Sequence, residues 1–327
     1  MDWIYATLGL LILLLAGDSL VRGAVNMSLR LGVPALIVSL TIVAFGTSAP
    51  ELLISIRAVS DGAPGIALGN VVGSNTANIL LVLGIPALIS VMHTSHCETR
   101  KNYLSMMAAS IVFVALAFRG VFDWKAGLIL LAGLALMLGD ALLHARRHRR
   151  EMAALAADGE APGEEEFDEL EDLEGADPDM PWWKILVFLV LGLIGLPLGA
   201  DLLVDSSISI ARMFGVSEVV IGLTLVAVGT SLPELATTVM AAIRQQADVA
   251  LGNVIGSNMF NLLAIIGVTT LIGPIPVAPE FLQFDLWVML GASALLFPFV
   301  FLGRDITRTW GIALTALYAG YVLAVLA

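Results

Sequence analysis

The sequence predicts an all-α polytopic membrane protein with ten transmembrane helices, arranged as two inverted five-helix repeats. The 327 residues are 58% hydrophobic and 13% charged, with a mean hydropathy of +0.94. That composition is too apolar for a soluble domain of this size. The apolar residues gather in ten separate stretches, and two polar sequence blocks recur at a constant offset of 183 residues. Together these observations indicate the fold class.

Ten stretches have the length and composition of membrane spans. A bilayer core about 30 Å thick requires roughly 20 apolar residues per helix. The stretches lie at 3–27, 34–58, 64–90, 103–118, 124–145, 182–211, 217–243, 248–272, 284–303 and 308–326. Five precede an acidic segment and five follow it. An odd number of spans in each half places the halves in opposite orientations, as in many secondary transporters.

The acidic segment divides the chain. Residues 158–179 hold 12 of the 28 acidic residues and no basic residue. A run of this kind is typical of a solvated linker. We therefore expect a first five-helix repeat over 1–150, an acidic linker over 151–181 and a second, inverted repeat over 182–327. No stripe of basic residues resembles a nucleic-acid-binding surface. The expected surroundings are the lipid bilayer, and no obligate protein partner is evident.

The distribution of Lys and Arg predicts the orientation, because cytoplasmic loops carry an excess of both. If the first connection is cytoplasmic, 12 of these residues lie inside and 4 outside. Both termini are then external and the acidic linker is cytoplasmic, in a plasma (inner) membrane of prokaryotic type. The first residues lack a basic region, so we expect the first stretch to be a retained helix and not a cleaved signal.

Polar sequence blocks recur inside the apolar stretches. Gly46-Thr-Ser-Ala-Pro-Glu51 returns as Gly229-Thr-Ser-Leu-Pro-Glu234, and Gly69-Asn-Val-Val-Gly-Ser-Asn-Thr-Ala-Asn78 returns as Gly252-Asn-Val-Ile-Gly-Ser-Asn-Met-Phe-Asn261. The two 53-residue segments that contain them share 24 identities without a gap. A carboxylate in mid-membrane costs roughly 2.5–3.5 kcal/mol. Two such carboxylates at matching positions predict a cation site.

The first block supplies hard oxygen ligands. Pro50 and Pro233 predict breaks in the second and seventh helices, and such breaks release backbone carbonyls. Carboxylates, carbonyls and hydroxyls together favour calcium, and sodium accepts the same oxygens. The blocks contain no thiol or imidazole, which argues against zinc and copper. The candidate side chains are Thr47, Ser48, Glu51, Thr230, Ser231 and Glu234.

The second block places polar residues on one helix face. Ser74 and Asn78 are four residues apart, as are Ser257 and Asn261, so each pair shares a face. The glycines of the block form a small-xxx-small pattern that allows close helix packing. The alternative interpretation is that these Ser, Asn and Gly residues only join helices. That interpretation leaves the paired carboxylates without a role.

The two GTSxPE motifs, each followed by GNxxGSNxxN, resemble the α-repeats of the sodium/calcium exchangers in the cation/calcium exchanger superfamily. The resemblance implies an eight-helix core that carries the ion site, with the first and sixth helices sliding across it to alternate access. It implies as ligands the side chains of Thr47, Ser48, Glu51, Ser74, Asn78, Thr230, Ser231, Glu234 and Ser257, and the backbone oxygens of Ala44 and Ala227.

Asn261 departs from the pattern of the family, in which many members carry Asp at this position. With Asn in both repeats the pocket holds two carboxylates, enough to neutralise one divalent cation. Potassium-dependent relatives rely on an acidic residue there, so the resemblance implies transport without potassium. The GNxxE signature of proton/calcium relatives is absent from both blocks.

The predicted function is a secondary-active antiporter, not an enzyme and without a cofactor, that exchanges cytoplasmic Ca²⁺ for external Na⁺. One alternative is a proton- or sodium-coupled exchanger of another divalent cation, Mn²⁺ or Mg²⁺. A channel is a second, although inverted repeats with broken helices favour alternating access. An intramembrane hydrolase is a third. It would require a Ser–His or paired-Asp arrangement at membrane depth, which this sequence does not provide. Asp18 and Asp201, at matching positions, are expected to make local hydrogen bonds.

Overall fold

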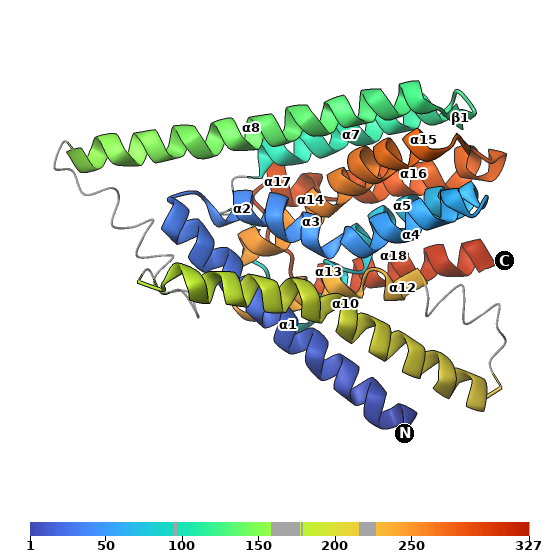
Figure 1. The fold of residues 1–327 in the computed structure, drawn as a ribbon, viewed down its shortest axis with the longest axis horizontal. Coiled ribbons are helices and arrows are strands. Elements are labelled where there is room, and N and C mark those ends of the chain that lie inside the picture. The colour runs from blue at the N-terminus through green and yellow to red at the C-terminus, as the bar shows by residue number, and fades with distance from the viewer. Residues whose placement is uncertain (95–96, 98, 158–176, 178, 216–226, 327) are drawn as a thin grey trace.

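The computed structural model describes residues 1–94, 97, 99–157, 177, 179–215 and 227–326. Within these residues the chain is mainly helical, and most helices run side by side along the longest axis of the molecule (Figure 1). Two long helices near the N-terminus and the middle of the chain lie along one side and cross the others obliquely (Figure 1). The acidic residues 158–176 lie outside the described part.

The first half begins with a 30-residue helix that ends at Gly32, whose left-handed backbone (φ 60°) closes the helix. The second predicted span is divided among four short helical pieces, one of them π-helical. The elements are α1 (Asp2–Leu31), α2 (Ala35–Val38), η1 (Ser39–Val43), α3 (Ala44–Thr47), α4 (Ala49–Ser60), α5 (Pro64–Leu80), α6 (Gly84–Ile89), α7 (Arg100–Ala117), β1 (Val121–Phe122) and α8 (Trp124–Ala157).

The second half has a similar series of helices, with the π-helical turns and the short strand at different places. Its elements are α10 (Trp182–Met213), α12 (Ala227–Gly229), α13 (Leu232–Ile243), α14 (Ala247–Phe260), η4 (Asn261–Ile265), α15 (Ile266–Ile272), β2 (Ile275–Pro276), η5 (Phe281–Asp285), α16 (Leu286–Ala294), α17 (Phe297–Phe301) and α18 (Arg308–Leu326). Strands β1 and β2 pair antiparallel and join the two halves. Each of the ten predicted stretches therefore contains helix.

Six of the described helices are long and apolar enough to cross a membrane by themselves: Asp2–Leu31, Pro64–Ile89, Trp124–His148, Trp182–Met213, Ala247–Ile272 and Phe281–Phe301. A seventh span results when Ala35–Thr47 and Ala49–Ser60, which are bent by 43° relative to each other, are taken together. The seventh predicted stretch contains a shorter apolar helix, Leu232–Ile243.

Both predicted helix breaks are present. Pro50 lies in the first turn of α4 and Pro233 in the first turn of α13. Proline is tolerated at these positions because the first N–H groups of a helix have no partner within the helix. Ser48 and Ser231 are the residues that precede the new helices, and each has a non-helical backbone. The breaks therefore come where the proline signal predicts them.

The buried apolar side chains of the described residues form two clusters. The larger one surrounds α5 and α14, whose apolar side chains are nearly all buried. The smaller one lies mainly between α1 and α10 and includes Leu13, Leu20, Leu189 and Leu196. The two helices approach closely at glycines: a Cβ at Gly192 would lie 2.6 Å from the Cβ of Leu20. Helices α1 and α10 thus pack closely against each other, and Val21 and Val25 of α1 also belong to the larger cluster.

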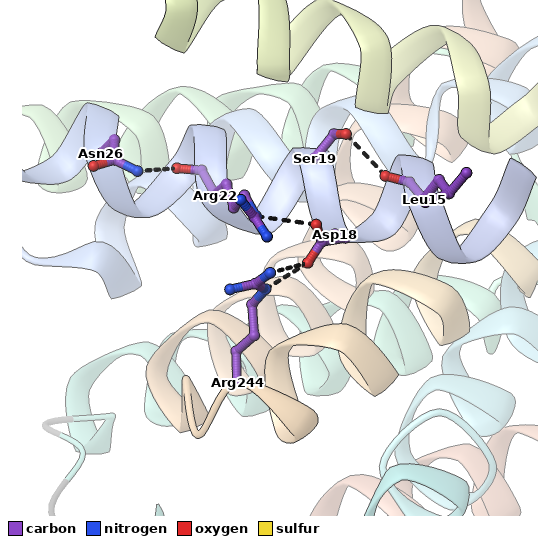
Figure 2. A network of polar contacts seen from close by, with 6 residues as sticks. All are labelled: Leu15, Asp18, Ser19, Arg22, Asn26 and Arg244. Carbon is purple, nitrogen blue, oxygen red and sulfur yellow. Dashed lines mark hydrogen bonds and ion pairs between the residues drawn. The ribbon is translucent and has the colours of Figure 1, made fainter. Parts of the chain in front are cut away.

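An ion pair ties α1 to the rest of the molecule. Figure 2 shows Asp18 of α1 between Arg22, one turn further along the same helix, and Arg244 at the end of α13. Arg22 Nε lies 3.0 Å from Asp18 Oδ2, and Arg244 donates through Nε and Nη2 to Asp18 Oδ1. The predicted local bonding of Asp18 therefore extends to a second helix. Asp201, at the matching position on α10, is exposed.

Candidate ion-binding site

The two copies of the repeated blocks meet in the middle of the molecule. Helix α4 packs against α5, and α13 packs against α14. Helix α14 also packs against α3 and α5, while α12 contacts α5. Each helix break therefore lies beside the polar helix of the other repeat, and both halves contribute to the same region.

The predicted ligands are shielded from the surface. Ten of them expose 5% or less of their surface: Ala44, Thr47, Ser48, Glu51, Ser74, Asn78, Ser231, Glu234, Ser257 and Asn261. Thr230 is half-buried, and Ala227 is the first residue of α12. Buried carboxylates are expensive unless a positive charge or hydrogen bonds compensate them. The region thus combines two buried acids with many polar oxygens.

Polar contacts join the first repeat to the second. Ser48 Oγ donates a hydrogen bond to Glu234 Oε1 over 3.0 Å. The hydroxyl oxygens of Thr47 and Ser257 lie 3.5 Å apart. These contacts bring together Thr47 and Ser48, beside the first helix break, and Glu234 and Ser257 of the second repeat.

Both carboxylates lie in the first turn of a helix. Glu51 is in the first turn of α4 and Glu234 in that of α13. The N-terminal end of a helix carries a partial positive charge, which stabilises a carboxylate. The preceding short helices, α3 and α12, end at the same breaks, and the C-terminal end of a helix carries a partial negative charge. Carbonyl oxygens at the ends of broken helices are the kind of neutral group that coordinates cations in transporters.

Two asparagines outside the predicted ligand set bond to the helices that carry the carboxylates. Asn70 Nδ2 donates to the backbone oxygen of Glu51 over 3.5 Å and to a hydroxyl one turn further along α4 over 3.3 Å. Asn253 Nδ2 makes the matching contacts with Glu234 and α13, over 3.4 and 3.2 Å. Both asparagines follow the first glycine of the second block. Their recurrence at the 183-residue offset is the signal in the sequence that could have identified them as part of the site.

Five buried side-chain oxygens of the predicted ligands have no hydrogen-bond partner among the described residues. They are Glu51 Oε2, Asn78 Oδ1, Ser231 Oγ, Glu234 Oε2 and Asn261 Oδ1. An unsatisfied buried polar atom costs about 1–3 kcal/mol, and a charged one costs more. A cation bound among these oxygens would satisfy several of them at once. The remaining acceptors therefore fit a cation better than they fit a closed protein core.

The other predicted ligands lie nearby in the chain. Ser74 is one turn before Asn78 on α5. The carbonyl oxygen of Ala44 accepts the Ser48 amide over 3.0 Å and the Thr47 hydroxyl over 3.3 Å. Within the described residues, no three His, Cys, Asp or Glu side chains gather into a metal-binding group. The donor set is thus made of hydroxyl, amide and carbonyl oxygens around two carboxylates, which suits hard cations.

Comparison with known proteins gives a consistent result. The family described as sodium/calcium exchanger protein matches residues 1–139 and 184–327. The chain is 36% identical over 322 residues to the putative antiporter CaxA of Alkalimonas amylolytica, covering 97% of this chain and 96% of CaxA. It is 34% identical over 346 residues to the sodium/calcium exchanger MaX1 of Methanosarcina acetivorans, covering 98% and 97%.

The fold has a close match among solved structures. The sodium-calcium exchanger NCX_Mj, soaked with zero Na⁺ and Ca²⁺, aligns with a TM-score of 0.79 and 32% sequence identity, over 99% of this chain and 98% of that one. A second structure of NCX_Mj, soaked with 2.5 mM Na⁺ and 1 mM Sr²⁺, aligns with a TM-score of 0.77. The residues matched by the family include every candidate ligand. The chain therefore belongs to the sodium/calcium exchanger protein family.

Proposed function

We propose that this protein is a secondary-active antiporter that exchanges Ca²⁺ for Na⁺ across the membrane by alternating access. The observation that carries the proposal is the set of buried oxygens that both repeats contribute, including those of Glu51 and Glu234, and that have no hydrogen-bond partner in the described part of the chain. Relatives that are named as antiporters or sodium/calcium exchangers align over nearly the whole chain, which supports the same function.

The charge and number of the ligands suit calcium. Calcium takes about six to eight oxygen ligands, and two carboxylates balance its charge. The proposed ligands are the side chains of Thr47, Ser48, Glu51, Ser74, Asn78, Thr230, Ser231, Glu234, Ser257 and Asn261, with the carbonyl oxygens of Ala44 and Ala227. Sodium binds the same kinds of oxygen ligand and requires less negative charge from them. Competition of the two cations for the same carboxylates then couples their opposite movements.

The α1–α10 pair is the moving part in this proposal. The smaller apolar cluster lies mainly between these two helices, and their contacts with the rest of the molecule are mainly with α13 and α2. Small residues line these contacts: a Cβ on Gly17 of α1 would lie 2.9 Å from the backbone oxygen of Ala236 on α13. Two helices that pack mainly against each other can move together relative to the helices that carry the site. Their movement would open the site to one side at a time.

The finer organisation is also part of the proposal. The two repeats would span 1–150 and 182–327, separated by the acidic linker 151–181. Helix α8 continues to Ala157, so the first residues of the linker extend this helix. Both termini would be external and the linker cytoplasmic, in the inner membrane of a prokaryotic cell, following the excess of Lys and Arg in the connections assigned to the inside.

The test is calcium uptake by purified protein in sealed proteoliposomes. An outward Na⁺ gradient should drive Ca²⁺ accumulation, and a proton gradient of the same size should not. Excess Mn²⁺ or Mg²⁺ in the medium should reduce uptake only weakly. Uptake driven by protons alone, or transport of Mn²⁺ in preference to Ca²⁺, would replace the proposal with exchange of another divalent cation.

A further inference from the structure

A second pair of asparagines lies directly behind the proposed ligands Asn78 and Asn261. Asn75 is on α5 and Asn258 is on α14, each one turn before the ligand of its own helix. All four side chains expose only 1% of their surface. Their hydrogen bonds connect the two repeats and follow the twofold relation between them.

The inner pair is held by backbone oxygens of the opposite helix. Asn75 Nδ2 donates to the backbone oxygen of Asn258 over 3.2 Å, and Asn258 Nδ2 donates to the backbone oxygen of Asn75 over 3.4 Å. A carbonyl oxygen only accepts hydrogen bonds. Each inner side chain must therefore direct its NH₂ group to the partner backbone, and its Oδ1 atom points the other way.

The outer pair is held by those Oδ1 atoms. Asn78 Nδ2 donates to Asn258 Oδ1 over 3.0 Å, and Asn261 Nδ2 donates to Asn75 Oδ1 over 3.0 Å. Turning either outer amide over would place oxygen against oxygen. The Oδ1 atoms of Asn78 and Asn261 are consequently left without a partner among the described residues. The inner pair thus determines which atom of each outer asparagine remains available.

We propose that Asn75 and Asn258 are positioning residues of the ion site. Each holds the ligand asparagine of the opposite repeat so that it presents its amide oxygen, and not its NH₂ group, to the cation. The inference rests on the proposed function, because it assumes that Asn78 and Asn261 are ligands. Since each inner residue acts on the other repeat, the network also aligns the two halves of the site.

The same network selects a neutral amide at both ligand positions. An ionised carboxylate at 78 or 261 has no hydrogen to donate to the inner Oδ1 atom. It would have to keep a proton, or the inner asparagine would have to turn and lose its bond to the backbone. Asn75 and Asn258 therefore limit the pocket to the charges of Glu51 and Glu234.

The test is a set of double-mutant cycles on Ca²⁺ affinity, measured by calorimetry on the full-length protein in detergent. Removal of a residue that orients a metal ligand typically weakens binding by about 10- to 100-fold, and we expect this range for Asn75→Ala. The combination of Asn75→Ala with Asn261→Ala should bind no more weakly than Asn261→Ala alone. The combination of Asn75→Ala with Asn78→Ala should lose the product of the two single effects.

The symmetric cycle provides an independent measurement. Asn258→Ala should be non-additive with Asn78→Ala and additive with Asn261→Ala. If an alanine variant does not fold, serine at the same position keeps a small polar group that is too short to reach the opposite helix. Thr76→Val is the matched control, because Thr76 is buried on α5 and, among the described residues, its hydroxyl bonds only within that helix, to Val72 over 3.0 Å. Its Ca²⁺ affinity should equal that of the wild type.

Two results separate the inference from the function on which it rests. If Glu51→Gln leaves Ca²⁺ binding unchanged, the proposed site itself is wrong. If Glu51→Gln abolishes binding while the Asn75 and Asn258 variants bind like the wild type, only the positioning role is wrong. Equal coupling of Asn75 to both ligand asparagines would also overturn it, because a residue with a purely structural role has no preference between them.

Discussion

Ser48 donates a hydrogen bond to Glu234, and this contact crosses from one repeat to the other. The matching contact does not form in the described structure: Ser231, the counterpart of Ser48, has a buried hydroxyl without a hydrogen-bond partner. The two carboxylates therefore have different surroundings although their sequences are equivalent. One oxygen of Glu234 is already satisfied by protein, which leaves fewer of its lone pairs for an ion.

This asymmetry predicts different effects for two equivalent substitutions. Ser48→Ala removes a hydrogen bond to a charged group, worth about 1.5–3 kcal/mol. Ser231→Ala removes a hydroxyl that has no partner, so it should leave stability unchanged or slightly increased. The measurement is thermal unfolding in detergent with a chelator present. Equal destabilisation by the two substitutions would show that the two carboxylates are held alike.

Asn261→Asp should change how transport depends on pH. A third carboxyl group beside Glu51 and Glu234 cannot ionise as easily as the first two, which adds a protonation step to the pocket. Asn78→Asp should act in the same way, because it occupies the matching position and meets the same type of inner asparagine. The wild-type protein should transport Ca²⁺ equally well with and without potassium.

These expectations are checked by sodium-driven Ca²⁺ flux over roughly pH 5 to 9 for the wild type and both variants. Thr76→Val again serves as the control on α5. A potassium requirement in the wild type, or unaltered pH profiles in both Asp variants, would mean that Asn78 and Asn261 do not face the ion.

The ion pair between Asp18 and Arg244 should stabilise the arrangement seen in Figure 2. The side chain of Arg244 is 8% exposed and that of Asp18 is 20% exposed, so the pair is largely shielded from water. Asp18→Asn and Arg244→Gln should each lower the melting temperature, and the double variant should show a coupling of at least about 1 kcal/mol.

The control for this pair is Arg57–Asp61, whose side chains are 85% and 66% exposed. Exposed pairs contribute about 0–1 kcal/mol, so Asp61→Asn should have little effect. Because α1 belongs to the proposed moving pair, loss of the Asp18 contact should also change the rate of exchange more than the affinity for Ca²⁺. Additive effects of Asp18→Asn and Arg244→Gln would show that the contact has no stabilising role.

The acidic linker should be dispensable for transport. Replacing residues 158–176 by an equal length of Gly and Ser should leave Ca²⁺ exchange largely intact, because their composition cannot form an apolar core. The end of the linker must be kept: the Asp177 amide donates to Asn26 over 2.7 Å, and Arg30 donates to the Met180 carbonyl over 2.9 Å. Loss of activation by calcium in this variant, at equal protein level, would identify the linker as a sensor.

Several features of the fold were predictable because their signals are local. The length of the apolar stretches indicates the helices, and the positions of Pro50 and Pro233 indicate the breaks. The 183-residue offset shows that the two halves have equivalent parts. Even the supporting role of Asn70 and Asn253 has a signal in that repetition, although the sequence alone does not say what they contact.

Other features depend on packing between distant segments. The repetition makes Asn75 equivalent to Asn258, but it does not show that each one bonds to the ligand of the other repeat. Asp18 and Arg244 are 226 residues apart, and only the contact of α1 with α13 brings them together. The π-helical turns, including η4 at Asn261, arise from local adjustments of helix winding that have no clear sequence signal.

The central claim is that Glu51 and Glu234 bind the transported calcium, and it is tested most directly by Ca²⁺ uptake into proteoliposomes driven by a sodium gradient. Glu51→Gln and Glu234→Gln each remove half of the charge of the site while keeping nearly the same volume, so each should abolish uptake in a protein that remains folded. Glu280→Gln, the same change at an exposed position outside the site, should transport like the wild type. Near-normal uptake by either site variant would contradict the assignment.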